Sequence, residues 1–223
     1  SDLFGTTGQR CTAASRVLVH KAVYDRFLDT LRSAADKLVI GPGLDSATDV
    51  GPLVNEQQML KVLDYIRIGR EEGARLVTGG NRIREGLCEY GFFIRPTIFA
   101  DVLSAMRIAQ EEIFGPVVSL IRFSSLDEAI AIVNDVRFGL SSSIYTRNVN
   151  SSAVAERDLH TGIVYINAST IGAEIQLPFG GWKHSGSGHP EAGGQGGALD
   201  FFSRMKVIYR DFSGRLQKAQ IDQ

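Results

Sequence analysis

The clearest indication of the fold is the stretch Val117-Val118-Ser119-Leu120-Ile121-Arg122-Phe123, which continues as Ser124-Ser125-Leu126-Asp127-Glu128. Its first half is rich in β-branched and other apolar residues, which predicts a strand. Ser125 and Glu128 have the spacing of a capping box and predict a short helix through Val133. A second β-rich run at 140–145 predicts another strand. The stretch is therefore a strand–helix–strand unit.

The same alternation extends along the chain in both directions. Further strands are expected at 15–20, 74–78, 91–99 and 162–166, with helices at 22–38, 55–73 and 151–159. Repeated units of this kind predict an α/β fold with an open, mainly parallel sheet and helices on both faces. In such sheets ligands usually bind at the carboxyl ends of the strands, so we expect functional residues there.

Composition narrows the possible partners. The chain has 223 residues and a formal net charge of -1, which gives no electrostatic reason to expect nucleic acid or an anionic membrane surface. No apolar run approaches the roughly 20 residues that span a bilayer. The two cysteines, Cys11 and Cys88, lie far apart in sequence, so we expect no disulfide scaffold and a cytoplasmic, reducing location.

Cys11 is the first candidate for chemistry. It lies among small and polar residues in Gly8-Gln9-Arg10-Cys11-Thr12-Ala13-Ala14, whereas a cysteine kept for packing usually has apolar neighbours. The residues after it can start a helical turn whose N–H groups would face the sulfur and bind a developing oxyanion. Local chemistry leaves two interpretations, an accessible nucleophile or a free thiol in a surface turn.

Other uses of Cys11 are less favoured. A Cys–His hydrolase needs a nearby histidine, and none of His20, His160, His184 and His189 stands in a sequence that indicates such a role. No pair of cysteine or histidine residues has the spacing of metal ligands, so no metal site is expected. Cys88 lies in a polar loop and is interpreted as incidental.

The second candidate is Glu111-Glu112-Ile113-Phe114-Gly115-Pro116, just before the strand Val117–Phe123. One interpretation is a solvated acidic loop in which Phe114 packs into the core. The other places a carboxylate and an aromatic ring together at the edge of a cleft. A carboxylate can accept two hydrogen bonds from a ribose diol, and a ring can pack on a flat cofactor.

The third candidate is the glycine-rich run at 178–188. Gly186-Ser187-Gly188 superficially suggests a phosphate loop, but no strand leads into it and Glu191 stands where a third glycine would be expected. We interpret the run as a packed loop that forms one wall of a site. Arg10, Arg95 and Lys183 are assigned no role.

Together these three stretches resemble the aldehyde dehydrogenase superfamily, and their order and spacing agree with it over almost the whole chain. The residues that carry the resemblance are Phe4, Gly8, Gln9 and Cys11, then 111–116, then Pro178-Phe179-Gly180-Gly181, Lys183, Ser185, Gly186 and Gly188.

The resemblance implies a chemistry and a set of roles. The thiolate of Cys11 would attack an aldehyde to give a thiohemiacetal, hydride would pass to NAD or NADP, and water would cleave the resulting thioester to a carboxylic acid. Glu112 would bind the ribose next to the nicotinamide, Phe114 would pack near the nicotinamide, and the N–H of Cys11 would form half of an oxyanion hole.

The resemblance also implies a substrate loop over 167–177, with Ile171, Gly172, Ala173 and Glu174 as its candidate contact residues. This loop is more similar to the branches that oxidise carboxylated semialdehydes than to those that act on simple aliphatic aldehydes. Backbone N–H groups of the loop would meet the substrate carboxylate, because the loop contains no arginine.

Members of the superfamily are roughly twice as long, with an N-terminal coenzyme-binding domain that supplies the main cofactor site, an oxyanion-hole asparagine and a water-activating glutamate. We expect this domain to be absent here, so that the fragment binds NAD(P) poorly and is inactive. Residues 1–190 would form the catalytic domain and 191–223 an extended segment. The resemblance implies a homo-oligomer in the full-length protein, built partly through 201–209.

Two alternatives remain open from the sequence. One is a non-catalytic, truncated domain that serves packing or assembly. The other is a CoA-acylating relative, in which CoA rather than water resolves the thioester.

Overall fold

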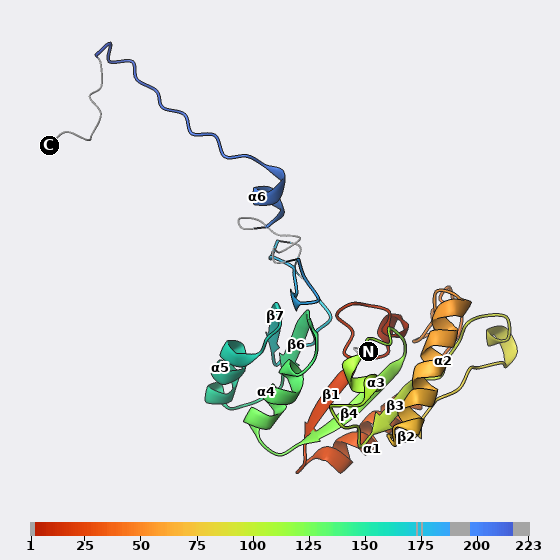
Figure 1. Cartoon of the computed structure of the whole chain (residues 1–223). Helices are drawn as coiled ribbons and strands as arrows, with labels where there is room; N and C mark the ends of the chain where they lie inside the picture. Colours follow the sequence, from red (N-terminus) through yellow and green to blue (C-terminus); the bar gives the residue numbers. More distant parts are fainter. Residues whose placement is uncertain (1–2, 173, 175, 188–196, 216–223) are drawn as a thin grey trace.

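The structure is a computed structural model of the chain and describes residues 3–172, 174, 176–187 and 197–215 (Figure 1). Its strands are β1 (Arg16–His20), β2 (Arg75–Thr78), β3 (Thr97–Ala100), β4 (Val117–Phe123), β5 (Phe138–Gly139), β6 (Ser141–Ile144), β7 (Ile163–Ile166) and β8 (Trp182–Lys183). Its helices are α1 (Tyr24–Ala35), α2 (Glu56–Glu71), α3 (Arg107–Gln110), α4 (Leu126–Asn134), α5 (Val149–Asp158) and α6 (Ala198–Phe202), with 3-10 turns η1 (Gly5–Gly8) and η2 (Gly86–Cys88).

The main sheet has the strand order β1-β4-β3-β2. Strand β4 is parallel to both β1 and β3, while β2 pairs antiparallel with β3 at the edge. Strands β6 and β7 form a separate parallel pair, and β5 and β8 a short antiparallel pair. The predicted α/β fold with a mainly parallel sheet is confirmed.

Helices cover both faces of the main sheet, as predicted (Figure 1). Because side chains alternate along a strand, β4 contributes to two separate cores. Val117 and Ile121 pack with residues of α2 and α3, whereas Val118 and Leu120 pack with Tyr24 and other residues of α1. Strand β4 therefore lies at the centre of the domain.

The predicted helix starts are confirmed by their caps. The Asn55 side chain accepts a hydrogen bond from the Gln58 backbone N–H at the start of α2. At the start of α4, the Ser125 hydroxyl accepts one from the Glu128 N–H at 3.2 Å. The Glu128 carboxylate accepts in turn from the N–H of Ser124, one residue before the position that a standard capping box uses.

Two predicted segments differ from the structure. The strand expected at 91–99 is reduced to β3, because Pro96 has no N–H for a ladder and Ile94 forms only an isolated bridge to Arg82. The segment 191–223, expected to be extended, contains the short helix α6, and residues 203–215 have no strand partner in the described structure. Those residues run away from the body, with their side chains exposed (Figure 1).

The expectation that the functional residues lie at the carboxyl ends of the strands is wrong for the first two candidates. Cys11 comes before β1 and Glu112 comes before β4, and these two strands are parallel. Both residues therefore lie at the amino edge of the sheet. The segment 167–172, by contrast, follows the carboxyl end of β7.

Within the described residues, no helix combines the length and the apolar character that a membrane span requires.

Candidate active site

Cys11 lies in a short exposed turn between η1 and β1. The Ala13 N–H donates to the Arg10 carbonyl at 3.0 Å, which places Cys11 at the second position of a single turn. The thiol is free and exposed. The turn does not continue into a helix, since β1 starts at Arg16, so no helix dipole acts on the sulfur. The sulfur is accessible, as the sequence predicted.

Gly8 brings the cysteine segment against the acid segment. Its backbone is left-handed (φ +66°), and a Cβ at this position would lie 2.6 Å from the carbonyl carbon of Gly115. Only glycine permits both the conformation and the approach. The neighbouring Thr7 hydroxyl donates to the Gly51 carbonyl at 3.0 Å, and the Gln9 side chain accepts from the Val54 N–H at 3.0 Å. Three contacts, made by Thr7, Gly8 and Gln9, therefore fix the turn before Cys11.

The two adjacent acids have different environments. The Glu111 carboxylate accepts two hydrogen bonds from the Arg107 guanidinium at 2.9 Å each and one from the Tyr65 hydroxyl at 2.6 Å. These hydrogen bonds lower the pKa of Glu111 to about 2. The Glu112 side chain is exposed and has no hydrogen bond or ion pair to any described residue. Of the two carboxylates, only that of Glu112 is available to a ligand.

Phe114 is half-buried and has a left-handed backbone (φ +59°), which is uncommon for a residue with a large side chain. The Gln58 side-chain amide donates to the carbonyls of Ile113 and Phe114 at 2.9 and 2.8 Å. Lys61 Nζ donates to the Glu112 carbonyl at 3.0 Å. Two side chains from α2 thus hold the backbone on which Glu112 and Phe114 stand.

The predicted substrate loop reaches the cysteine turn through one hydrogen bond. The buried Thr170 hydroxyl donates to the carbonyl of Thr12, the residue after Cys11, at 2.7 Å. The hydroxyl of Tyr165, in β7, donates to the Gly172 carbonyl at 2.6 Å and connects the loop to that strand.

The four candidate residues of that loop differ in exposure. Ile171 is half-buried, and Gly172 and Glu174 are exposed, while Ala173 lies outside the described residues.

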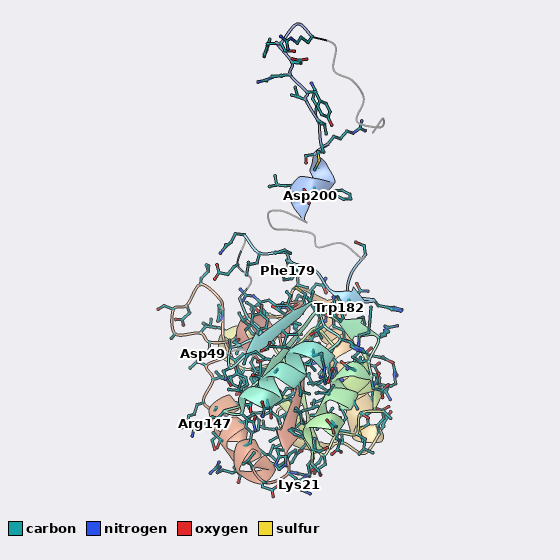
Figure 2. All side chains as sticks on the ribbon, turned by 90° about the vertical axis from the view of Figure 1, so that its left-hand side faces the viewer. Lys21, Asp49, Arg147, Phe179, Trp182 and Asp200 are labelled. Atoms are coloured by element: carbon teal, nitrogen blue, oxygen red, sulfur yellow. The ribbon has the colours of Figure 1, made fainter. Side chains whose placement is uncertain are left out.

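The late glycine-rich run is attached to the body by backbone contacts, although its described residues, 178–187, are exposed or half-buried and none is buried. The Ser185 hydroxyl accepts from the Gly139 N–H at 3.0 Å, and Gly162 approaches the Gly180 carbonyl so closely that no Cβ fits between them. In Figure 2, Phe179 and Trp182 lie at the opposite end of the body from Lys21, which follows the carboxyl end of β1. This run therefore lies toward the same edge of the sheet as the Cys11 turn.

Lys183, which was assigned no role from the sequence, has a structural one. Its Nζ donates to the carbonyl of Asn134, the last residue of α4, at 3.1 Å and to that of Val136, two residues later, at 2.8 Å. Arg16 donates to the carbonyls of Ile132 and Val133 on the same helix at 3.1 Å each. Cations at a helix C-terminus complement its dipole, so these two residues join β1 and β8 to α4.

Cys88 contrasts with Cys11. It is only 6% exposed, packs with Ile83 and Phe93, and its Sγ lies 3.7 Å from the Ile40 carbonyl oxygen. Burial raises the pKa of its thiol. The interpretation of Cys88 as a residue without a chemical role agrees with this packing.

Sequence reasoning missed the residues that assemble the site, namely Gln58, Lys61, Tyr65 and Thr170. Three of them come from one helix, at positions i, i+3 and i+7, and such a polar stripe is the signal that could have identified them. A hollow of about 400 Å³ lies beside them, lined by Val54, Asn55, Gln57, Gln58 and Lys61.

The fold and the three assembled segments are those of a known class of proteins. The chain matches the model of the aldehyde dehydrogenase family over residues 1–208. It belongs to this family.

Three known proteins illustrate the likeness. The α-ketoglutaric semialdehyde dehydrogenase of Bacillus subtilis (strain 168) is 43% identical over 206 residues, which cover 92% of this chain and 42% of the relative. The apo form of a variant betaine aldehyde dehydrogenase from Staphylococcus aureus superposes with a TM-score of 0.84 at 33% identity, covering 87% of this chain and 39% of that one. A 1-pyrroline-5-carboxylate dehydrogenase from Thermus, with bound NAD, gives 0.76 at 41% identity, covering 82% and 34%. The chain thus spans about two fifths of the length of such relatives.

Proposed function

We propose that this chain is the nucleophile-bearing part of an enzyme that oxidises an aldehyde to a carboxylic acid. The observation that supports the proposal is that two distant segments contact the Cys11 turn. The acid–aromatic segment meets it at Gly8, and the substrate loop meets it through Thr170, whose hydroxyl binds the Thr12 carbonyl. An exposed thiol, a free carboxylate and an aromatic ring are thereby held at one edge of the sheet.

In the proposed reaction the Cys11 thiolate adds to the carbonyl carbon of the aldehyde. A carbon–sulfur bond forms, and the carbonyl oxygen takes the negative charge, which the backbone N–H of Cys11 helps to stabilise. The carbon then loses a hydride with its electron pair, leaving a thioester on Cys11. Attack by water breaks the carbon–sulfur bond, releases the acid and restores the thiol.

The residues present fit one end of a nicotinamide cofactor. Glu112 offers an exposed carboxylate that can accept both hydrogen bonds of a ribose diol, and Phe114 offers a half-exposed ring on which the flat nicotinamide ring can pack. Lys61 and Gln58 line the adjoining hollow. Bound NAD or NADP supplies the acceptor for the hydride. The Thermus relative with bound NAD supports this assignment.

We propose a carboxylated semialdehyde as the substrate. The similarity to an α-ketoglutaric semialdehyde dehydrogenase supports this class. Glu174 is exposed in the substrate loop and would repel a substrate carboxylate. The Ile171 N–H already donates to the Ser169 hydroxyl at 3.0 Å, so we propose the backbone N–H groups of Gly172 and Ala173 as the contacts, with Ile171 beside them.

We propose that residues 1–190 are the catalytic unit and that 191–223 contact a second copy of the chain. The described part of the latter exposes a run of apolar side chains, which favours contact with another surface. These are Phe201, Phe202, Met205, Val207, Ile208, Tyr209 and Phe212.

Aldehyde recognition can be tested without the cofactor. Millimolar succinate semialdehyde is expected to slow the alkylation of Cys11 by iodoacetamide about tenfold, because the thiohemiacetal has no free thiolate. Tenfold protection corresponds to a shift of about 1.4 kcal/mol toward the bound state at that aldehyde concentration. Peptide mass spectrometry measures the rate. Cys11 of the urea-unfolded chain is the control and should show little protection at the same concentration. Equal protection in the folded and unfolded chains would refute specific aldehyde binding.

These 223 residues alone are proposed to turn over little aldehyde, because they span about two fifths of the relatives' length. The same samples supplied with NAD should therefore form NADH only slowly, as followed at 340 nm.

A further inference from the structure

One face of α2 holds the whole segment that carries the proposed cofactor residues. From Gln58 to Glu72 this face supplies a series of polar contacts to residues 107–114. Gln58 binds the carbonyls of Ile113 and Phe114, Lys61 binds the carbonyl of Glu112, Tyr65 binds the carboxylate of Glu111, and Glu72 accepts from the backbone N–H of Arg107. The segment is thus fixed from both of its ends.

The central contact of this series is a three-residue cluster. Arg107 and Glu111 are four residues apart and form a bidentate ion pair, and the Tyr65 hydroxyl completes the shell of the Glu111 carboxylate at 2.6 Å. Two cations lie near the Tyr65 ring, with Lys61 Nζ at 5.8 Å and the Arg107 guanidinium at 5.7 Å from its centroid. Burial and the Glu111 hydrogen bond both raise the pKa of Tyr65.

The segment cannot hold this conformation by itself. Helix α3 has only four residues, too few for a stable isolated helix. The left-handed backbone of Phe114 carries a cost that surrounding contacts must offset. Glu112 is exposed, and its side chain has no hydrogen bond or ion pair to a described residue, so its position depends entirely on its backbone.

We infer that Tyr65, acting through Glu111 and Arg107, is a positioning residue that fixes the Glu112 carboxylate and the Phe114 ring in the orientation that a nicotinamide ribose needs. Tyr65 has no proposed contact with the cofactor. The inference rests on the proposed function for its purpose, but the positioning itself is a property of this chain and can be measured without any ligand.

The test is the variant Tyr65→Phe, which keeps the ring and both cation contacts and removes only the hydroxyl. Amide hydrogen exchange is measured for Ala109, Gln110 and Glu111, whose N–H groups are bonded within α3 and its end. Exchange at these amides is expected to be about tenfold faster, while amides of β4 are unchanged, because one charge-assisted hydrogen bond is lost. Cleavage after Glu112 by a glutamate-specific protease should accelerate similarly.

Tyr90→Phe is the matched control, since the Tyr90 side chain is 87% exposed and the chemical change is the same. The double variant of Tyr65→Phe with Glu111→Ala should loosen the segment no more than Glu111→Ala alone, because alanine leaves the Tyr65 hydroxyl no acceptor at this position. If Tyr65→Phe leaves exchange and cleavage at the level of Tyr90→Phe, the inference is wrong.

A second readout separates this inference from the proposed function. Binding of nicotinamide mononucleotide, measured by ligand-observed NMR, should weaken in both Tyr65→Phe and Glu112→Gln, while thermal unfolding shows that both variants are folded at the temperature of the measurement. If Tyr65→Phe loosens the segment and neither variant changes binding, the positioning role stands and the proposed cofactor role of Glu112 fails.

Discussion

Iodoacetamide at neutral pH is expected to modify Cys11 about a hundred times faster than Cys88. Cys11 is exposed in a turn, whereas Cys88 is 6% exposed and can react only when the loop around it opens. A hundredfold difference corresponds to about 2.7 kcal/mol for that opening. The raised pKa of Cys88 also slows its reaction, because a smaller fraction of the Cys88 side chains is thiolate at neutral pH.

The measurement is a time course of peptide masses in the native chain, with the urea-unfolded chain as the control in which the two rates should converge. The rate at Cys88 should continue to rise at pH values above those at which an ordinary thiol is fully ionised, because its pKa is raised. Comparable rates for the two cysteines in the native chain would show that Cys11 is not presented for reaction.

Gly8→Ala is expected to destabilise the domain by about 2–5 kcal/mol. The left-handed backbone at this position costs an alanine about 1–2 kcal/mol, and forcing the Gly115 backbone away costs about 1–3 kcal/mol more. Urea unfolding, followed by circular dichroism, measures the change. Since this contact joins the cysteine segment to the acid segment, the substitution should also change the position of Cys11 relative to the acid segment.

Gly5→Ala is the matched control for this prediction. Gly5 lies three residues earlier in the same turn, η1, and nothing lies within 4 Å of its Cβ position. This change should alter the stability by no more than about 0.5 kcal/mol. Equal stability of the two variants would mean that the approach of Gly8 to Gly115 does not hold the site together.

Local signals were enough to predict most of the fold. The bounds of β4 follow from its apolar run, and the starts of α2 and α4 from Asn55 and Ser125, because strand composition and caps are properties of neighbouring residues. The start of β3 was misplaced because apolar residues before Pro96 have the composition of a strand but no ladder to join.

The site was predicted only in part, since its members depend on contacts between distant segments. The motifs identified Cys11, Glu112 and Phe114, but the sequence alone does not show that Glu111 is already bound by Tyr65 and Arg107. Nor does it show that Cys11 and Glu112 lie together at the amino edge of the sheet, which requires knowledge that β1 and β4 are parallel and adjacent.

Acylation by p-nitrophenyl acetate tests whether the folded chain makes Cys11 a nucleophile toward a carbonyl carbon. The thiolate attacks the ester, p-nitrophenolate leaves, and an acetyl thioester remains, which mass spectrometry locates. We expect the acetyl group on Cys11, formed at least about tenfold faster than on Cys11 of the urea-unfolded chain. Each rate is divided by the rate of N-acetylcysteine in the same solvent, which removes the effect of urea on the reaction itself. Acylation of folded Cys11 no faster than in the unfolded chain, or acetyl groups on other residues alone, would contradict the account.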